Sequence, residues 1–196
     1  MEITNEWLKS KNPCSDGYGW FLDSKKTDLC EILDSLLLEN HFDWANWVIV
    51  RKMNKKQKVQ YAIFAAEVAL GVYEKEYPEN DKPRKAIEAS KAYLKNPCVK
   101  TKDAAYAADA AVDAAVDAAN AAAAYAANPA AAYADVDAAY AASAAVYAAV
   151  YAAAAYADAD GYAAAAYAAN ADANDGIQTK IIEYGKSILK LNLKEA

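Results

Sequence analysis

The chain has 196 residues, of which 27 are acidic and 21 are basic, so its formal net charge is −6. Because 56% of the residues are hydrophobic and only six are Gly and five are Pro, the composition argues against disorder, collagen and a turn-rich all-β fold. Three Cys exclude a disulfide-dense scaffold, and an odd count fits a reducing compartment. The first residues lack the apolar segment of a signal peptide, so we expect a cytoplasmic protein.

The first hundred residues predict a series of short helices. The first helix is expected over residues 3–11, the second is capped by Ser15 or Asp16, and the third is capped by Thr27. The fourth covers residues 42–53, and the fifth begins at Asn54 and ends before Tyr77. The sixth has Pro83 in its first turn and ends at Asn96. In the fifth, apolar residues recur at helical spacing on one face. No segment alternates with a period of two. The sequence therefore predicts an all-α fold.

An Ala-rich stretch over residues 103–175 differs sharply from the rest of the chain. It holds ten Asp and nine Tyr but no Lys, Arg or Glu, so all 21 basic residues lie elsewhere. Pro129 and Gly161 divide it into three predicted helices, roughly 102–127, 129–159 and 162–174, and a conventional helix follows Gly176. We expect a compact helical region over 1–100 packed on an antiparallel Ala-rich helical region over 101–196, the two forming one continuous domain.

Two stripes in this stretch have a structural and a functional interpretation. Asp109, Asp113 and Asp117 share one helix face about 6 Å apart; they form either a solvated face or an acidic imitation of a nucleic-acid backbone. Tyr133, Tyr140 and Tyr147 recur every seven residues, and they either fill a seam between helices or form a contact face for a partner. The uncharged run over 138–157 has membrane length but carries four Tyr and no Leu, Ile or Phe, so we expect no membrane span.

Motifs of catalysis and metal binding are absent from the sequence. His41 is the one histidine, and there is no phosphate loop, nucleophile elbow or zinc-spaced Cys/His set. A pairing of Cys30 with His41 is interpreted as structural. We therefore expect no enzyme, no catalytic residue, no metal and no cofactor.

Two basic groups stand out in the N-terminal region. Arg51, Lys52, Lys55, Lys56 and Lys58 follow the Trp44–Trp47 pair and are interpreted as a solvated connector. Lys82, Arg84 and Lys85 surround Pro83 at a helix N-terminus, where the helix dipole disfavours cations. Arg84 and Lys85 therefore need an anion, either a neighbouring carboxylate or the phosphate of a ligand.

Three segments carry a resemblance to a known family. They are NPCSDGYGWF with Cys14, Asp16, Gly17 and Trp20; FDWANWVIV with Asp43, Trp44 and Trp47; and DKPRKAIEA with Asp81, Pro83, Arg84, Lys85, Ala86, Ile87 and Glu88. Followed by a long Ala-rich tail, this order resembles a family of bacterial and phage proteins described as immunity-protein-five-like. The resemblance implies neutralisation of a toxin or of a defence system, with no catalytic residues to carry over.

Several functions remain open at this point. The first is an inhibitor that binds a protein toxin or, if phage-borne, a host defence effector in the host cytoplasm. The alternatives are a sponge that holds a small anionic nucleotide signal through Arg84, Lys85 and stacking aromatics, a structural or oligomerising helical protein, and an acidic nucleic-acid mimic. We expect no direct DNA binding, and homo-oligomers could form through the Ala-rich helices. The candidate partner- or ligand-binding residues are Lys82, Arg84, Lys85, Asp43, Trp44, Trp47, Tyr133, Tyr140, Tyr147, Asp109, Asp113 and Asp117.

Overall fold

A computed structural model describes residues 1–76, 78, 79, 81–96 and 175–191, and this part of the chain is all-α, as the sequence predicts. Its helices are α1 (Asn5–Ser10), α2 (Ser15–Ser24), α3 (Leu29–Leu38), α4 (Phe42–Lys52), α5 (Lys55–Glu76), α6 (Lys82–Lys95) and α10 (Asp175–Ile188). The predicted Ala-rich helices and their packing lie outside the described residues. No described helix combines the length and the apolarity needed to cross a membrane.

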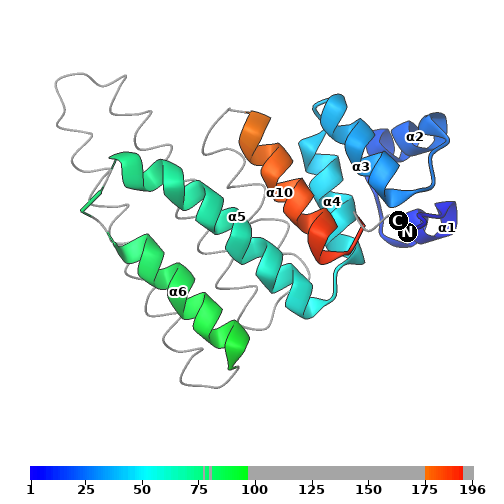
Figure 1. Cartoon of the computed structure of the whole chain (residues 1–196). Helices are drawn as coiled ribbons and strands as arrows, with labels where there is room; N and C mark the ends of the chain where they lie inside the picture. The colour runs from blue at the N-terminus through cyan, green and yellow to red at the C-terminus, as the bar shows by residue number, and fades with distance from the viewer. Residues whose placement is uncertain (77, 80, 97–174, 192–196) are drawn as a thin grey trace, which may run out of the picture.

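The described helices stand in a row (Figure 1). From one end to the other the order is α6, α5, α10, α4 and α3, with α1 and α2 beyond them, and α10 contacts α5, α4 and α3. The last described helix is therefore inserted between two helices from the first half of the chain. The C-terminal helix and the N-terminal region share one core.

The helix caps show where the sequence-based prediction was wrong by one or two residues. Cys14, rather than Ser15 or Asp16, caps α2, since its Sγ accepts a hydrogen bond from the backbone N–H of Gly17. Asp28, rather than Thr27, caps α3 by accepting from two backbone N–H groups. The carbonyl of Thr27 instead accepts from the N–H of Ile3 at 2.8 Å, next to an extended bridge between Glu2 and Asp28.

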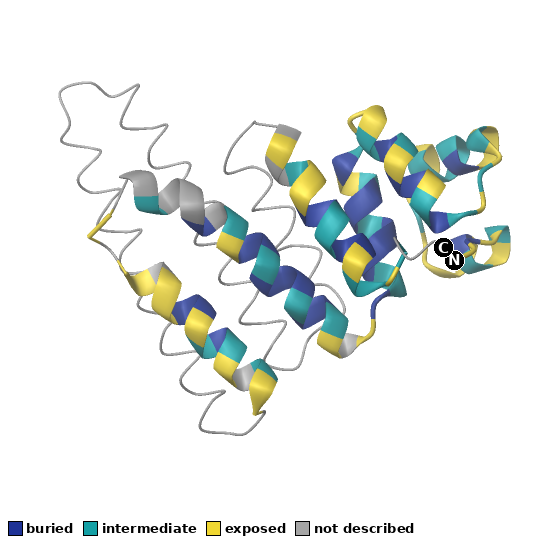
Figure 2. Cartoon of the chain, in the orientation of Figure 1, coloured by how far each residue is buried: buried dark blue, intermediate teal, exposed yellow. Residues whose placement is uncertain are grey.

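The turn between α4 and α5 follows the prediction closely. Asn54 and Gln57 form a reciprocal capping box, in which each side chain accepts from the other residue's backbone N–H, at 2.9 and 3.0 Å. Downstream, the apolar positions predicted for one face of α5 are buried, namely Val59, Ala62, Ile63, Ala66 and Leu70. Figure 2 shows this buried face along α5 and α10, whereas the outer surface of α6 is largely exposed.

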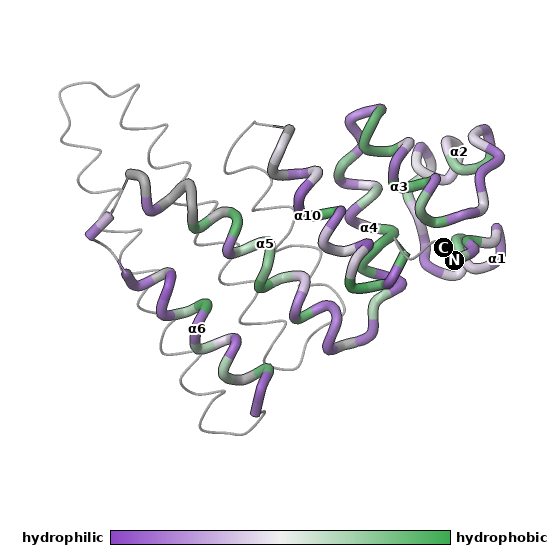
Figure 3. The backbone as a smooth tube through the Cα atoms, viewed as in Figure 1, coloured by the Kyte–Doolittle hydropathy of each residue, from purple (hydrophilic) through white to green (hydrophobic). Residues whose placement is uncertain are grey.

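The core is tightest where α10 meets α4 and α5. Ile181 and Ile182 are fully buried, and Gly185 packs so closely that an added Cβ would lie 2.6 Å from Ile49 and 2.8 Å from Tyr61. Hydrophobic positions recur along α3, α4 and α5, and hydrophilic ones dominate α6 (Figure 3). Because glycine has no side chain, α10 approaches its neighbours more closely there than any other residue would allow.

An ion triad fixes the end of α10. The Lys186 ammonium is 3% exposed and pairs with Asp34 of α3 and, at 2.6 Å, with Glu183. Burial by itself lowers the pKa of Lys186, but the two carboxylates outweigh burial and raise it. The charge at the end of this buried side chain is therefore balanced by two carboxylates that are open to solvent.

Candidate functional site

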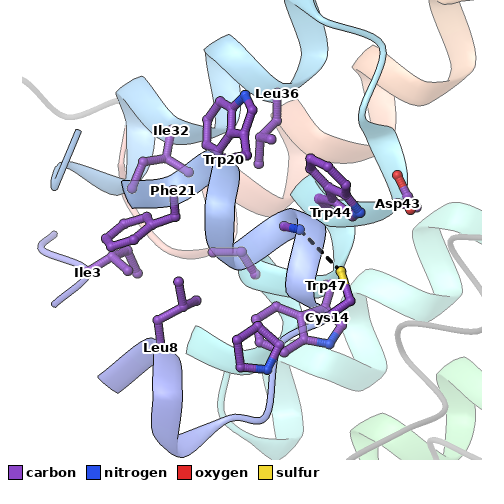
Figure 4. A pocket seen from close by; sticks show the side chains of 13 residues that line it. Ile3, Leu8, Cys14, Trp20, Phe21, Ile32, Leu36, Asp43, Trp44 and Trp47 are labelled. Carbon is purple, nitrogen blue, oxygen red and sulfur yellow. Dashed lines mark hydrogen bonds between the residues drawn. The ribbon is translucent and has the colours of Figure 1, made fainter. Parts of the chain in front are cut away.

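A cleft of about 270 Å³ opens among α1, α2, α3 and α4 (Figure 4). Its floor consists of buried apolar side chains that belong to the core: Ile3, Leu8, Phe21, Ile32, Leu36 and Val48. These residues come from all four helices and from the segment before α1. The cleft therefore exists only when the N-terminal segment is folded against α3 and α4.

The mouth of the cleft is rich in aromatic side chains. Half-buried or exposed residues surround it: Pro13, Cys14, Gly17, Trp20, Asp43, Trp44 and Trp47. Three of the four Trp in the chain meet here. Tryptophan combines a large apolar surface with one polar N–H group, and this is why it is frequent where proteins hold partners.

Each Trp at the mouth is held in place by a specific contact. The Trp20 Nε1–H donates to Glu39 Oε2 at 2.7 Å. The Trp44 ring stacks on His41, with centroids 4.1 Å apart and an angle of 12° between the planes. The Arg51 guanidinium lies 3.8 Å from the centre of the Trp47 ring. The aromatic rings are thus fixed before any partner arrives, which lowers the entropic cost of binding.

Gly17 brings α2 close to α4 at this cleft. A Cβ at this position would lie 3.1 Å from Cys14 Sγ and 3.6 Å from the Trp44 ring. The sulfur of Cys14, which caps α2, is exposed at the mouth beside this contact. One side of the cleft is therefore formed by the capped first turn of α2.

The cleft provides an apolar binding surface with few ionisable side chains. Of its lining residues only Cys14 and Asp43 carry an ionisable side chain, and the floor carries none. Within residues 1–96 and 175–191, as far as these are described, no three His, Cys, Asp or Glu side chains gather closely enough to hold a metal ion. Such a lining suits the burial of an apolar group from a partner.

The structure brings together three of the residues that the sequence singled out, Asp43, Trp44 and Trp47. Trp20, Cys14 and Gly17 complete the mouth but were not among the candidates. They could have been found from the sequence, since they belong to the NPCSDGYGWF segment that carries part of the family resemblance. The candidates Asp109, Asp113, Asp117, Tyr133, Tyr140 and Tyr147 lie outside the described residues.

The basic group around Pro83 lies elsewhere, because α6 is at the opposite end of the row from α1 and α2 (Figure 1). Arg84 donates two hydrogen bonds to the Glu74 carboxylate of α5, at 2.8 and 2.6 Å, and this pairing raises the pKa of Arg84. Lys85 pairs with Asp81 at 2.7 Å. Lys82 is exposed at the start of the helix. The sequence analysis expected either a neighbouring carboxylate or a ligand phosphate beside Arg84 and Lys85, and the structure places a carboxylate beside each.

Cys30 and His41 have separate structural surroundings. Burial, and then the charge of Asp34, raises the pKa of the Cys30 thiol, which disfavours the nucleophilic thiolate at neutral pH. His41 stacks on Trp44 and precedes the first residue of α4. Their contacts are those of packing residues.

A comparison with known families gives one match. Residues 49–178 match the family described as Imm-5 like putative immunity protein, which is about two thirds of the chain. No curated protein and no solved structure matches the chain. The matched range contains the DKPRKAIEA segment with Arg84 and Lys85, whereas the residues that line the cleft, among them Trp20 and Trp44, lie before it.

Proposed function

The chain belongs to the Imm-5 like immunity protein family, and from this premise we propose that it neutralises a protein toxin or defence effector by binding it directly, without catalysis. The single observation that carries this proposal is the cleft among α1–α4, where three Trp rings are held at the surface over an apolar floor. Immobilised aromatic rings around a hollow are typical of the centre of protein–protein interfaces.

The cations that the sequence singled out for a nucleotide do not support a nucleotide signal. Arg84 and Lys85 are each paired with a carboxylate of this chain and lie on α6, away from the aromatic cleft (Figure 1). The floor of the cleft also has no hydrogen-bonding side chain that could recognise a nucleobase. We therefore keep the inhibitor as the proposed function.

The test is a titration of a candidate toxin with the purified protein. Candidate toxins are the products of genes adjacent to the gene for this chain, co-expressed first in a growth-rescue assay. We expect rescue, a complex of defined stoichiometry in light scattering, and toxin activity that falls in proportion to added protein until one equivalent is reached. Protection at far below one equivalent would instead indicate catalysis, and protection against none of the candidates would contradict the proposal.

A matched pair of variants connects the titration to the cleft. Trp47→Ala removes one ring from the mouth, whereas Tyr184→Ala removes a half-buried aromatic ring of α10 that does not line the cleft. Each variant loses one packed ring and one contact, that of Trp47 with Arg51 and that of Tyr184 with Phe64. We expect the dissociation constant for the toxin to rise at least tenfold more for Trp47→Ala, as roughly 2 kcal/mol or more is usual for a central aromatic residue.

A further inference from the structure

Four basic side chains gather beside the cleft, where the end of α1 meets the end of α4, and we call them the basic rim: Lys9, Lys11, Arg51 and Lys52. Lys52 Nζ lies 3.9 Å, and Lys11 Nζ 5.9 Å, from the centre of the same ring, Trp7. Arg51 lies over Trp47, which lines the cleft, and Lys9 lies 5.7 Å from the centre of the Tyr18 ring. The sequence predicted a solvated connector at Arg51 and Lys52, but both pack on indole rings.

Lys11 and Lys52, at the centre of the basic rim, share the Trp7 ring and repel each other. Lys52 Nζ donates to the backbone carbonyl of Glu2 at 3.1 Å, and neither Lys52 nor Lys11 forms an ion pair with a carboxylate in the described part of the chain. Burial, and then the charge of Lys11, lowers the pKa of Lys52, so two repelling cations share one ring. An anion brought to this place by a partner would relieve the repulsion.

The acidic groups of the mouth are too far along α4 to do this. Asp43 lies in the first turn of α4, and Glu39 precedes the helix and binds Trp20. Eight residues separate Asp43 from Arg51, which corresponds to about 12 Å along the helix axis. The mouth is therefore acidic at one end of α4 and basic at the other.

From these contacts we infer that the cleft and the basic rim together bind an acidic polypeptide segment that inserts one apolar side chain between Trp44 and Trp47. The cleft volume of about 270 Å³ is below that of most drug-sized ligand pockets, so it suits a single side chain. Its apolar floor favours an aliphatic or phenyl group over a nucleobase. Acidic residues next to this anchor would meet Lys11 and Lys52. The inference rests on the proposed function and specifies the chemistry of the partner.

The experiment uses the purified full-length protein and short acetylated probes, with intrinsic Trp fluorescence as the signal. The probes are the pentapeptides Glu-Glu-Phe-Glu-Glu, Glu-Glu-Ala-Glu-Glu and Lys-Lys-Phe-Lys-Lys, and a ten-nucleotide deoxythymidine strand. We expect the first probe to bind at least tenfold more tightly than each of the other three, with affinity that falls as salt is added. Equal or tighter binding of the basic peptide or of the oligonucleotide, or no binding of the first peptide at millimolar concentration, would overturn the inference.

Charge reversals locate the site. Lys11→Glu with Lys52→Glu should raise the dissociation constant of the first peptide at least tenfold. The control variant, Lys95→Glu with Lys180→Glu, makes the same change in net charge at exposed positions of α6 and α10. It should change the dissociation constant of the first peptide less than twofold. Because Lys52 packs on Trp7, the pair Lys9→Glu with Lys11→Glu, both exposed, gives a second test that leaves this contact intact. An equal response of both rim variants and the control variant would contradict the assignment.

The toxin titration keeps the two proposals separate. If a toxin is neutralised at one equivalent and the rim variants neutralise it as well as the wild type, the inhibitor function stands and the acidic-segment inference fails. If no candidate toxin is neutralised while the acidic peptide binds as expected, the proposed function fails and the binding chemistry of the cleft stands.

Discussion

The two faces of α4 differ in how completely they are covered. On one face Ala45, Asn46 and Ile49 are fully buried, and Ile49 lies where α10 approaches most closely. On the other face Asp43, Trp44 and Trp47 line a cleft that remains open to solvent. The same eleven-residue helix therefore supports a sealed core and an open aromatic surface.

The buried face of α4 and its open face have different roles: the buried face stabilises the fold, and the open face is available for binding. At the junction of α4, α5 and α10 there is no room for an added methyl group at Gly185, whereas the cleft leaves about 270 Å³ unfilled beside large aromatic rings. A folded protein gains by filling such a volume, because unfilled apolar space forfeits contacts. The sealed face accordingly accounts for stability, and the open face is available for a partner.

The largest effect is expected from a cavity in the sealed junction. Ile182→Ala should lower the free energy of unfolding by about 2–5 kcal/mol, because Ile182 is fully buried on α10. Leu38→Ala, at a residue that is 85% exposed, should stay within about 0.5 kcal/mol. Urea denaturation measures both, and similar losses for the two variants would show that α10 is not part of the core.

A buried hydrogen bond in the same junction gives the next effect. The Tyr61 hydroxyl donates to Asn46 Oδ1 at 3.1 Å, and both residues are fully buried. Tyr61→Phe should therefore cost about 1–3 kcal/mol in urea denaturation. Tyr184→Phe makes the same change at a half-buried position and serves as the comparison; a cost at Tyr61 no greater than that at Tyr184 would contradict this hydrogen-bonding role.

Burial of Tyr61 also predicts a pH dependence. Burial raises the pKa of Tyr61 well above its ordinary value near 10, so the folded state keeps this proton after the unfolded state has lost it. The free energy of unfolding contributed by this group is therefore complete below pH 10 and declines as the pH rises above it. In denaturation between pH 8 and 11, the wild type should lose stability more steeply than Tyr61→Phe, and parallel curves would contradict the assignment.

Two helical glycines give a smaller and more diagnostic effect. Gly185→Ala should destabilise the protein by up to about 2 kcal/mol, since overpacking against Ile49 and Tyr61 outweighs the gain in helix propensity. Gly19→Ala on α2 meets no atom within 4 Å and should stabilise it by up to about 1 kcal/mol. Thermal melts that move both variants in the same direction would contradict the close packing assigned to Gly185.

The smallest effect is expected at the basic group of α6. Arg84 and Lys85 are exposed and paired with Glu74 and Asp81. The double variant Arg84→Gln with Lys85→Gln should neutralise the toxin with an unchanged dissociation constant and melt within a few degrees of the wild type. A large loss of neutralisation with an unchanged melting temperature would shift the binding site from the cleft to α6.

The helices themselves were predictable from local features of the sequence. Pro83, Asn54 and the apolar period of α5 each act within one or two turns, and the structure has the corresponding ends and buried faces. The caps were harder, since the bridge between Glu2 and Asp28 and the hydrogen bond from Ile3 to Thr27 accompany an N-cap at Asp28, and these contacts are not local.

The cleft was only partly predictable. Trp44 and Trp47 stand out as a pair, but their meeting with Trp20 depends on how α2 packs on α4, which helical period does not determine. The insertion of α10 beside α4 was beyond prediction for the same reason, because an apolar helix face does not identify its partner. Likewise, a run of Lys and Arg looks solvated in sequence, and stacking on Trp7 and Trp47 becomes visible only in three dimensions.

The central claim is that the open face of α4 is where a toxin is bound, and the exposed thiol of Cys14 allows this face to be blocked in the folded protein. The measurement is the toxin titration with Cys98→Ser protein before and after reaction with N-ethylmaleimide. Two further proteins receive the same treatment: Cys14→Ser, which keeps a capping oxygen but gains no adduct, and Cys14→Ala, which lacks the cap and the adduct. We predict that the adduct on Cys14 abolishes stoichiometric neutralisation while both controls retain it. Full neutralisation by the modified protein would contradict the account.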